Sequence, residues 1–285
     1  MSILRVKRGL VLSDNIEDYP EGLIFPIDKP YRWTSADVIR KIKWAACRHF
    51  HDKKLKVGHA GTLDPLATGV LLVCIGKATK SAEELQRHDK EYLAGVLFGA
   101  TTPSYDREKD IDRRYPVGNV SKERVAKVLE EFIGEQEQVA PLFSAKSVDG
   151  VRAYELARRE YKLSKGTGFD HSGEELLSKQ MINVPKLELI AFYDSPHESE
   201  QAVSQENRFN DRINVIDTSS LKLPQADILV ECSKGTYIRA LARDIGEALD
   251  SGAFLNSLRR TATGDFRVED CLDIEEAMAI LGHTA

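Results

Sequence analysis

Residues 57–71 read Val-Gly-His-Ala-Gly-Thr-Leu-Asp-Pro-Leu-Ala-Thr-Gly-Val-Leu, and they place one acid, Asp64, among apolar and small residues. Carboxylates are rarely left in apolar surroundings without a partner or a task. The flanking glycines permit a tight backbone and the close approach of another molecule, and Pro65 stiffens the turn after the carboxylate. The stretch therefore predicts an acid presented to a ligand from a rigid loop. On the residues alone, a structural aspartate that caps its own turn is the alternative.

Helices and strands can be predicted outward from this loop. A buried strand over residues 69–75 follows it, and residues 23–28 predict a strand before it. Apolar residues at helical spacing predict an amphipathic helix over 36–47, with an N-cap at Thr34-Ser35. Further strands are expected over 91–99, 186–192 and 228–232, and further helices from Ser121 to Gly134 and over 237–249. Strands separated unevenly by helices indicate an α+β fold with a mostly antiparallel central sheet flanked by helices.

Two polar segments interrupt this pattern. Residues 162–180 are rich in Gly and Ser, and residues 194–212 lack periodicity. Both are expected to be loops or mobile insertions.

Composition limits the class of protein. The chain has 285 residues, of which 42% are apolar and 30% charged, as in ordinary soluble globular proteins. The apolar run over residues 70–75 is too short to span a bilayer, and the N-terminus lacks the apolar core of a secretory signal. The four cysteines are far apart and form no C-x-x-C, so neither a zinc site nor a disulfide framework is expected. These features favour the cytoplasm.

Charge is distributed unevenly along the chain. The net charge of −5 argues weakly against a nucleic-acid partner. However, residues 38–56 and 146–165 are rich in Lys and Arg, whereas acids gather after Asp265. Basic faces on an acidic protein can still bind a phosphate backbone. The alternative is that each basic run is one solvated helix face.

Two uninterrupted motifs carry a family resemblance. Residues 58–80, GHAGTLDPLATGVLLVCIGKATK, resemble the catalytic motif of the TruB-type tRNA pseudouridine synthases, and residues 232–239, CSKGTYIR, resemble a second signature of that family. The resemblance implies the pseudouridine synthase fold and makes Asp64 the nucleophile that attacks the target nucleotide. Whether the attack falls on the base or on the ribose stays open. Either route needs an ionised carboxylate in a partly desolvated pocket.

The same resemblance gives roles to four other residues. Arg239 is implied to pair with Asp64, and an Arg fork suits a carboxylate. Tyr237 is implied to lie against the target base, and Tyr92, in a K-x-Y segment, is implied to stack on the uridine and is a candidate for moving a proton. His59 is implied to contact RNA. Without the family, Arg239 is expected to be a surface helix charge and Tyr237 a core aromatic. Tyr92 is expected to be a half-buried strand tyrosine, and His59 a turn or core histidine.

A further block implies an inserted thumb that closes on RNA. Residues 138–146 with Gly150 and residues 154–158 resemble the start of this insertion, which we expect over about 138–182. A second polar excursion is expected over about 194–224. From these basic segments and the motifs we predict an RNA-contacting set: Lys29, Arg40, Lys43, Lys146, Arg158 and Lys234.

The resulting prediction is one catalytic domain over residues 1–285 without a C-terminal PUA domain. The resemblance implies isomerisation of a T-loop uridine of tRNA, at position 55, with base flipping and with no cofactor or metal. The partner is the T arm of tRNA, and no membrane or obligate protein partner is implied. The alternatives are a guide-RNA-dependent synthase of the dyskerin kind and a non-catalytic chaperone that folds tRNA. An intact motif set argues against the chaperone.

Overall fold

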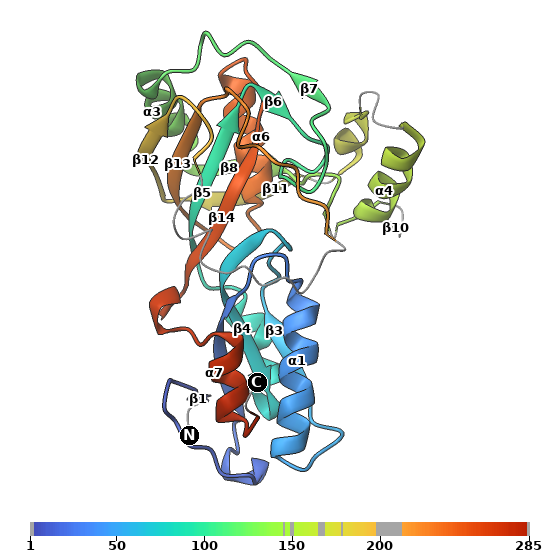
Figure 1. Cartoon of the computed structure of the whole chain (residues 1–285), viewed down its shortest axis with the longest axis vertical. Helices are drawn as coiled ribbons and strands as arrows, with labels where there is room; N and C mark the ends of the chain where they lie inside the picture. Colours follow the sequence, from blue (N-terminus) through green and yellow to red (C-terminus); the bar gives the residue numbers. More distant parts are fainter. Residues whose placement is uncertain are drawn as a thin grey trace. The chain divides into compact units, whose positions relative to one another are not determined.

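The computed structural model describes residues 3–144, 146–148, 151–164, 169–177, 179–197 and 213–283. The chain forms two compact units (Figure 1). The first combines the chain up to Glu91 with the chain from Arg259 onward, and the second contains the described residues from Tyr92 to Leu258. The expectation of one catalytic domain stays a prediction.

The first unit is built on antiparallel strands. Its strand order is β1-β2-β4-β14, β3 also pairs with β4, and β15 pairs with β14. In the register of β2 against β4, Leu23 lies opposite Ile75 and Lys29 opposite Gly69, while β1 runs parallel to β2. The bounds are β1 (Leu4–Arg5), β2 (Leu23–Lys29), β3 (Val57–Ala60), β4 (Ala67–Ile75), β14 (Ala253–Thr263, ending in this unit) and β15 (Phe266–Arg267).

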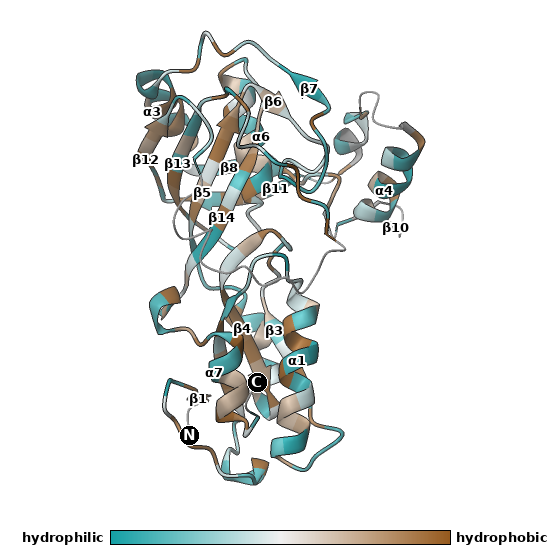
Figure 2. Cartoon of the chain, in the orientation of Figure 1, coloured by the Kyte–Doolittle hydropathy of each residue, from teal (hydrophilic) through white to brown (hydrophobic). Residues whose placement is uncertain are grey.

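Strand β4 is the centre of this unit's core. All of its residues are buried, and Figure 2 shows it largely in the brown of apolar residues. A strand buried on both faces reads as a continuous apolar run, which explains why the sequence marks it so clearly.

Helix α1 (Ser35–His49) follows β2 in the first unit. Thr34 is its N-cap and forms a capping box with Asp37, which satisfies two main-chain donors at the helix start. Val38, Ile42 and Ala45 are buried at helical spacing. The other helical segments of this unit are η1 (Ile16–Asp18), η2 (Gly76–Ser81), α2 (Ala82–Leu85), η4 (Val268–Asp270) and α7 (Ile274–Ile280).

The second unit continues with the strand order β14-β5-β13-β12, in which β12 and β13 are antiparallel. Helix α6 contacts α3 and β8, and α3 contacts β12. The main bounds are β5 (Lys90–Phe98, which begins in the first unit), β12 (Lys186–Tyr193), β13 (Gln225–Cys232), α3 (Lys122–Glu131), α4 (Ala153–Ser164) and α6 (Ile238–Ala248). Smaller elements are β6 (Ala100–Thr101) with β7 (Arg113–Arg114), β8 (Gly134–Val139) with β11 (Lys179–Val184), β9 (Ser147–Val148) with β10 (Val151–Arg152), and η3 (Ser172–Leu176).

The predicted α+β fold and its named helices and strands are confirmed. The largest difference concerns residues 162–180, which were expected to be a loop. Their first three residues continue α4 and their last two begin β11, while residues 172–176 form a 3-10 turn. Part of the second predicted excursion, residues 198–212, lies outside the described residues. Within the described chain, no helix has the length and apolarity needed to cross a membrane.

Candidate active site

Asp64 lies in the loop between β3 and β4, in the first unit. Leu63 is 4% exposed and Leu66 9%, whereas the Asp64 side chain is partly exposed. The neighbouring leucines therefore anchor the loop in the core while the carboxylate stays accessible. A turn hydrogen bond from the Ala67 amide to the Asp64 carbonyl (3.1 Å) closes the loop.

Buried polar side chains hold this loop by its main chain. Ser35, the first residue of α1, accepts from the Leu63 amide (3.0 Å) and donates to the Leu63 carbonyl (3.1 Å). Arg260, on β14 and 2% exposed, donates to the carbonyls of Val70 (2.7 Å) and Gly61 (3.1 Å). Because both partners are buried, loss of either would leave main-chain groups without a bond, at a cost of about 1–3 kcal/mol each.

The backbone conformation and the surroundings of Gly69 explain why β4 needs a glycine beside this loop. Its φ is +101°, and a Cβ there would lie 2.1 Å from the carbonyl oxygen of Arg260. The same point is fixed from β2, because Asp28 accepts from the Gly69 amide (3.1 Å) and from both terminal nitrogens of Arg259 (2.7 and 3.1 Å). The close approach that the glycines suggested is therefore made by the protein's own β14 at this position.

Lys29 requires a correction, because we predicted that it contacts RNA. It is fully buried at the end of β2, and its ammonium donates to the carbonyls of Pro30 (2.9 Å), Trp33 (2.6 Å) and Pro65 (3.3 Å). Burial lowers the pKa of Lys29 to about 7, although the negative charge of Asp64 opposes this shift. A buried ammonium engaged by three carbonyls is not available to a phosphate. Its position instead supports the residue that follows Asp64.

His59 lies on β3 and is half-buried. Burial, and then the positive charge of Arg260, lower the pKa of His59 below its ordinary value. Its Nδ1 is buried and has no hydrogen-bond partner within the described chain. The predicted RNA contact stays a prediction, and the lowered pKa favours a neutral imidazole for that contact rather than a cation.

The other predicted catalytic residues lie in the second unit, Tyr92 on β5 and the other two at the start of α6. Tyr92 is 8% exposed. Gly235, with φ +94°, forms the turn before α6. Tyr237 follows as the N-cap, and Gln138 of β8 pairs with both its amide (2.8 Å) and its carbonyl (3.2 Å). These two hydrogen bonds fix the main chain that carries Tyr237, while the residue stays partly exposed.

Arg239 is buried inside the second unit, where two main-chain carbonyls and one carboxylate surround its guanidinium. It is 6% exposed and donates from its two terminal nitrogens to the carbonyls of Ser104 and Phe143, each at 3.0 Å. Its Nε lies 3.8 Å from the carboxylate of Asp106. Sequence reasoning missed Ser104 and Asp106, which lie in an ordinary polar turn of the sequence. The predicted pairing of Arg239 with Asp64 joins residues of different units and stays a prediction.

The remaining predicted RNA contacts are accessible. Arg40 and Lys43 lie on the solvent face of α1, Arg158 on α4 and Lys234 in the turn before α6, and all four are exposed, whereas Lys146 is partly exposed. Arg40 also forms an ion pair with Asp37 at 2.6 Å. Their roles in RNA binding stay predictions. Over the described chain, no group of three or more His, Cys, Asp or Glu side chains could hold a metal ion.

Comparison with known proteins places these residues in a family. The model described as TruB family pseudouridylate synthase (N terminal domain) matches residues 48–167, and that described as tRNA pseudouridylate synthase B C-terminal domain matches residues 239–283. The tRNA pseudouridine synthase B of Phocaeicola vulgatus is 47% identical over 90% of this chain and 92% of its own length. That of Flavobacterium johnsoniae is 40% identical over 90% of this chain and 95% of its own length.

Solved structures share the fold at lower identity. A chain in the crystal structure of a Cbf5-Nop10-Gar1 complex matches 94% of this chain with a TM-score of 0.57 and 24% identity. The present chain spans only 62% of that chain, so this likeness concerns the fold alone. The much higher identity to proteins named tRNA pseudouridine synthase B favours the stand-alone type over the guide-RNA-dependent alternative.

Fold and motifs together define a pseudouridine synthase. Within that class the chain belongs to the TruB family, and it is an enzyme that forms pseudouridine in tRNA. The chaperone alternative is therefore wrong.

Proposed function

We propose that this enzyme isomerises the T-loop uridine at position 55 in the T arm of tRNA, with Asp64 as the nucleophile. The observation that carries the proposal is the loop of Asp64, in which the main chain is fixed from several sides while the carboxylate stays partly exposed. A nucleophile gains rate from being held in a reactive position, and a rigid loop supplies this without ordering at the moment of reaction.

In this proposal, the base leaves the stack before the reaction begins. Asp64 attacks the base or the ribose, the bond between ribose and base nitrogen breaks, and the base turns. A carbon–carbon bond then forms and the bond between Asp64 and the nucleotide breaks, which frees the carboxylate. The proton on that base carbon is lost, and the ring nitrogen that left the ribose gains a proton. The reaction is a redox-neutral isomerisation, so electrons balance without a further reactant.

The other residues act on the nucleotide or on the nucleophile. Tyr92 and Tyr237 offer ring faces to the extruded base, and the Tyr92 hydroxyl is a candidate for moving the proton. We propose that Arg239 keeps Asp64 charged and oriented during the reaction. The exposed cations at Arg40, Lys43, Arg158 and Lys234, with Lys146, bind phosphates, and a neutral His59 contacts the T loop.

The test compares Asp64→Asn with a matched variant, Asp265→Asn. The Asp265 side chain is 89% exposed and lies 3.7 Å from Arg5, so it offers the same substitution at a surface site of the same unit. With unmodified tRNA transcript, Asp64→Asn should form no product and Asp265→Asn should match the unmodified enzyme. Binding to tRNA should stay within about threefold for both variants, because affinity rests on phosphate contacts.

Chemical mapping of pseudouridine identifies the position, and a transcript with cytidine at position 55 should give no product. Product at another uridine would contradict the T-loop assignment, and normal turnover by Asp64→Asn would contradict the role of the aspartate. Arg239→Lys, which keeps the charge but loses the planar fork, should lower activity more than affinity. Equal losses in both would indicate a purely RNA-binding role for Arg239.

A further inference from the structure

Residues 169–177, which we here name the latch segment, are packed into the second unit although their sequence is polar. Phe169 is 8% exposed, Glu174 9% and Leu177 4%. The two apolar side chains join a core cluster that contains Leu142 and Phe143. Burial of a carboxylate among apolar groups is costly unless it is paired, so the contacts of Glu174 decide what the segment does.

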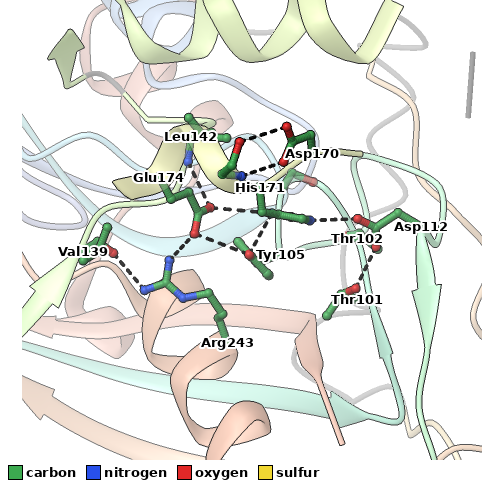
Figure 3. Close-up of polar contacts among 12 residues, drawn as sticks. Thr101, Thr102, Tyr105, Asp112, Val139, Leu142, Asp170, His171, Glu174 and Arg243 are labelled. Carbon is green, nitrogen blue, oxygen red and sulfur yellow. Dashed lines mark hydrogen bonds and ion pairs between the residues drawn. The ribbon is translucent and has the colours of Figure 1, made fainter. Parts of the chain in front are cut away.

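Glu174 is paired with Arg243 of α6 inside this cluster (Figure 3). Nη1 of Arg243 lies 2.6 Å from Glu174 Oε2, and its Nη2 donates to the Val139 carbonyl at 3.0 Å. The second oxygen of Glu174 accepts from the Leu142 amide at 3.4 Å. Burial lowers the pKa of Arg243, but the charges of Asp244 and Glu174 outweigh this and raise it overall. The latch segment is therefore tied to both α6 and the chain around Leu142.

His171 ties the latch segment to a second place, the turn at Tyr105 (Figure 3). Its Nε2 lies 2.8 Å from Asp112 Oδ2 and its Nδ1 2.8 Å from the Tyr105 hydroxyl, which is 3.5 Å from Glu174 Oε2. An imidazolium satisfies all three contacts, since it donates from both nitrogens and leaves the phenol free to donate to Glu174.

The charges around His171 favour this protonated form. Burial lowers the pKa of His171, but hydrogen bonds and the negative charges of Asp112 and Glu174 outweigh it and raise the pKa to about 9. Other charged groups that interact with these residues come from the latch segment, α4 and α6, and they are Asp170, Glu160, Arg243, Asp244 and Glu247.

The contacts of Glu174 and those of His171 both reach residues next to the groups that bind Arg239. Tyr105 has φ +54°, a left-handed conformation that costs a non-glycine residue of order 1 kcal/mol, and it separates Ser104 from Asp106. Those two residues supply a carbonyl and a carboxylate to Arg239. On the other side, Glu174 holds Leu142, the neighbour of Phe143, whose carbonyl also accepts from Arg239. The strained turn is held by its own hydrogen bonds between Thr102 and Asp106 (2.7 and 3.1 Å) and, in addition, by the contact of the buried phenol with His171.

We propose that the latch segment positions Arg239, with His171 and Glu174 acting as positioning residues for the catalytic step. The inference rests on the proposed role of Arg239 in the reaction. Neither His171 nor Glu174 touches the nucleotide in this proposal. They fix the two stretches of chain that set the direction of the guanidinium.

The test uses Glu174→Gln and His171→Gln in the full-length enzyme, with Glu137→Gln as the matched control. Glu137 forms an ion pair with Lys179 at 3.1 Å between β8 and β11, but both side chains are at least 60% exposed. Glu174→Gln should lower the single-turnover rate of pseudouridine formation roughly ten- to hundredfold, because a small misplacement of a positioned group is costly. Affinity for tRNA should stay within about threefold, and the control should match the unmodified enzyme.

Hydrogen exchange separates positioning from general loss of structure. Both latch variants should exchange faster at residues 102–106 and 142–144, while α1 and β4 stay protected. A rate that stays normal although exchange at residues 102–106 has increased would overturn the inference. If Arg239→Lys and Arg239→Ala keep full activity, the proposed role of Arg239 in the reaction fails, and the latch inference fails with it. If they are inactive but both latch variants are normal, only the latch inference fails.

The pH profile supplies a readout that a merely structural contact would not move. Since the pKa of His171 is raised above its ordinary 6.5, its stabilisation of the docked segment is complete below pH 6.5 and is lost as the pH rises through about 9. The rate advantage of the unmodified enzyme over His171→Gln should therefore shrink between pH 6.5 and 9.5. An advantage that stays constant over this range would contradict the role of the charged imidazole.

Discussion

Substitution of Gly69 by alanine tests how tightly β14 holds the loop of Asp64. The new Cβ would lie 2.1 Å from the Arg260 carbonyl oxygen, and ordinary contacts begin at 3.4 Å. The two strands would have to separate by the difference, 3.4 − 2.1 = 1.3 Å, in a part of the core where β4 is buried throughout. Left-handed backbone costs an alanine about 1 kcal/mol, and overpacking of this size adds about 3 kcal/mol.

Gly134→Ala is the matched control for this prediction. Gly134 has φ +100°, almost the value of Gly69, but no described atom lies within 4 Å of its hypothetical Cβ. It should therefore lose only the backbone contribution of about 1 kcal/mol, against about 4 kcal/mol for Gly69→Ala. Urea unfolding followed by circular dichroism measures both free energies of unfolding.

The substitution should also affect catalysis. Arg260 holds the carbonyls of Gly61 and Val70, so a shift of its main chain moves both ends of the loop that carries Asp64. We expect a lower rate of pseudouridine formation from the folded Gly69→Ala protein, measured at a temperature where it stays native. Equal destabilisation by the two alanine variants would refute the close approach of β14 to β4.

Two further predictions concern the first unit. Thr34→Ala removes the cap that accepts from the Asp37 amide at 3.0 Å and should lower the free energy of unfolding by about 1 kcal/mol, whereas Thr34→Ser should restore most of it in the same urea experiment. Lys29 should resist acetylation in the folded protein while exposed Lys43 reacts, and the difference should vanish in urea, as peptide mass spectrometry can show. Equal labelling of the two lysines in the folded state would contradict the burial of Lys29.

Local patterns predicted much of the fold because the decisive interactions were local. The start of α1 was predicted from an N-cap at Thr34-Ser35, and Thr34 does cap the helix, in a capping box with Asp37 three residues later. Strand β4 was found because it is apolar on both faces. The latch segment could not be read in this way, because Glu174 is stabilised by Arg243, which is 69 residues away. A buried ion pair between distant positions leaves two ordinary charged residues in the sequence.

The charged residues of the candidate site show the same limit of prediction from local sequence patterns. Asp64 could be singled out because an acid in an apolar run is unusual on its own. The shape of its loop could not be predicted, since Ser35, Arg260 and Lys29 reach it from three other segments. Arg259 and Arg260 are two adjacent cations inside β14, but no strand was predicted at these residues from the sequence.

Buried cations that bind main-chain carbonyls are the common feature of both units. Lys29 and Arg260 hold the chain around Asp64, and Arg239 and Arg243 hold the chain at residues 104 and 139–143. A carbonyl bond fixes the position of a loop without using the side chain at that point, which leaves the side chain free to act on a substrate. In a protein that binds tRNA, cations are expected at the surface, and the sequence offers no way to separate the two uses. Burial in the structure distinguishes the two uses. A cation that binds main-chain carbonyls is buried with them, whereas a cation that binds phosphate must be exposed to solvent before RNA binds.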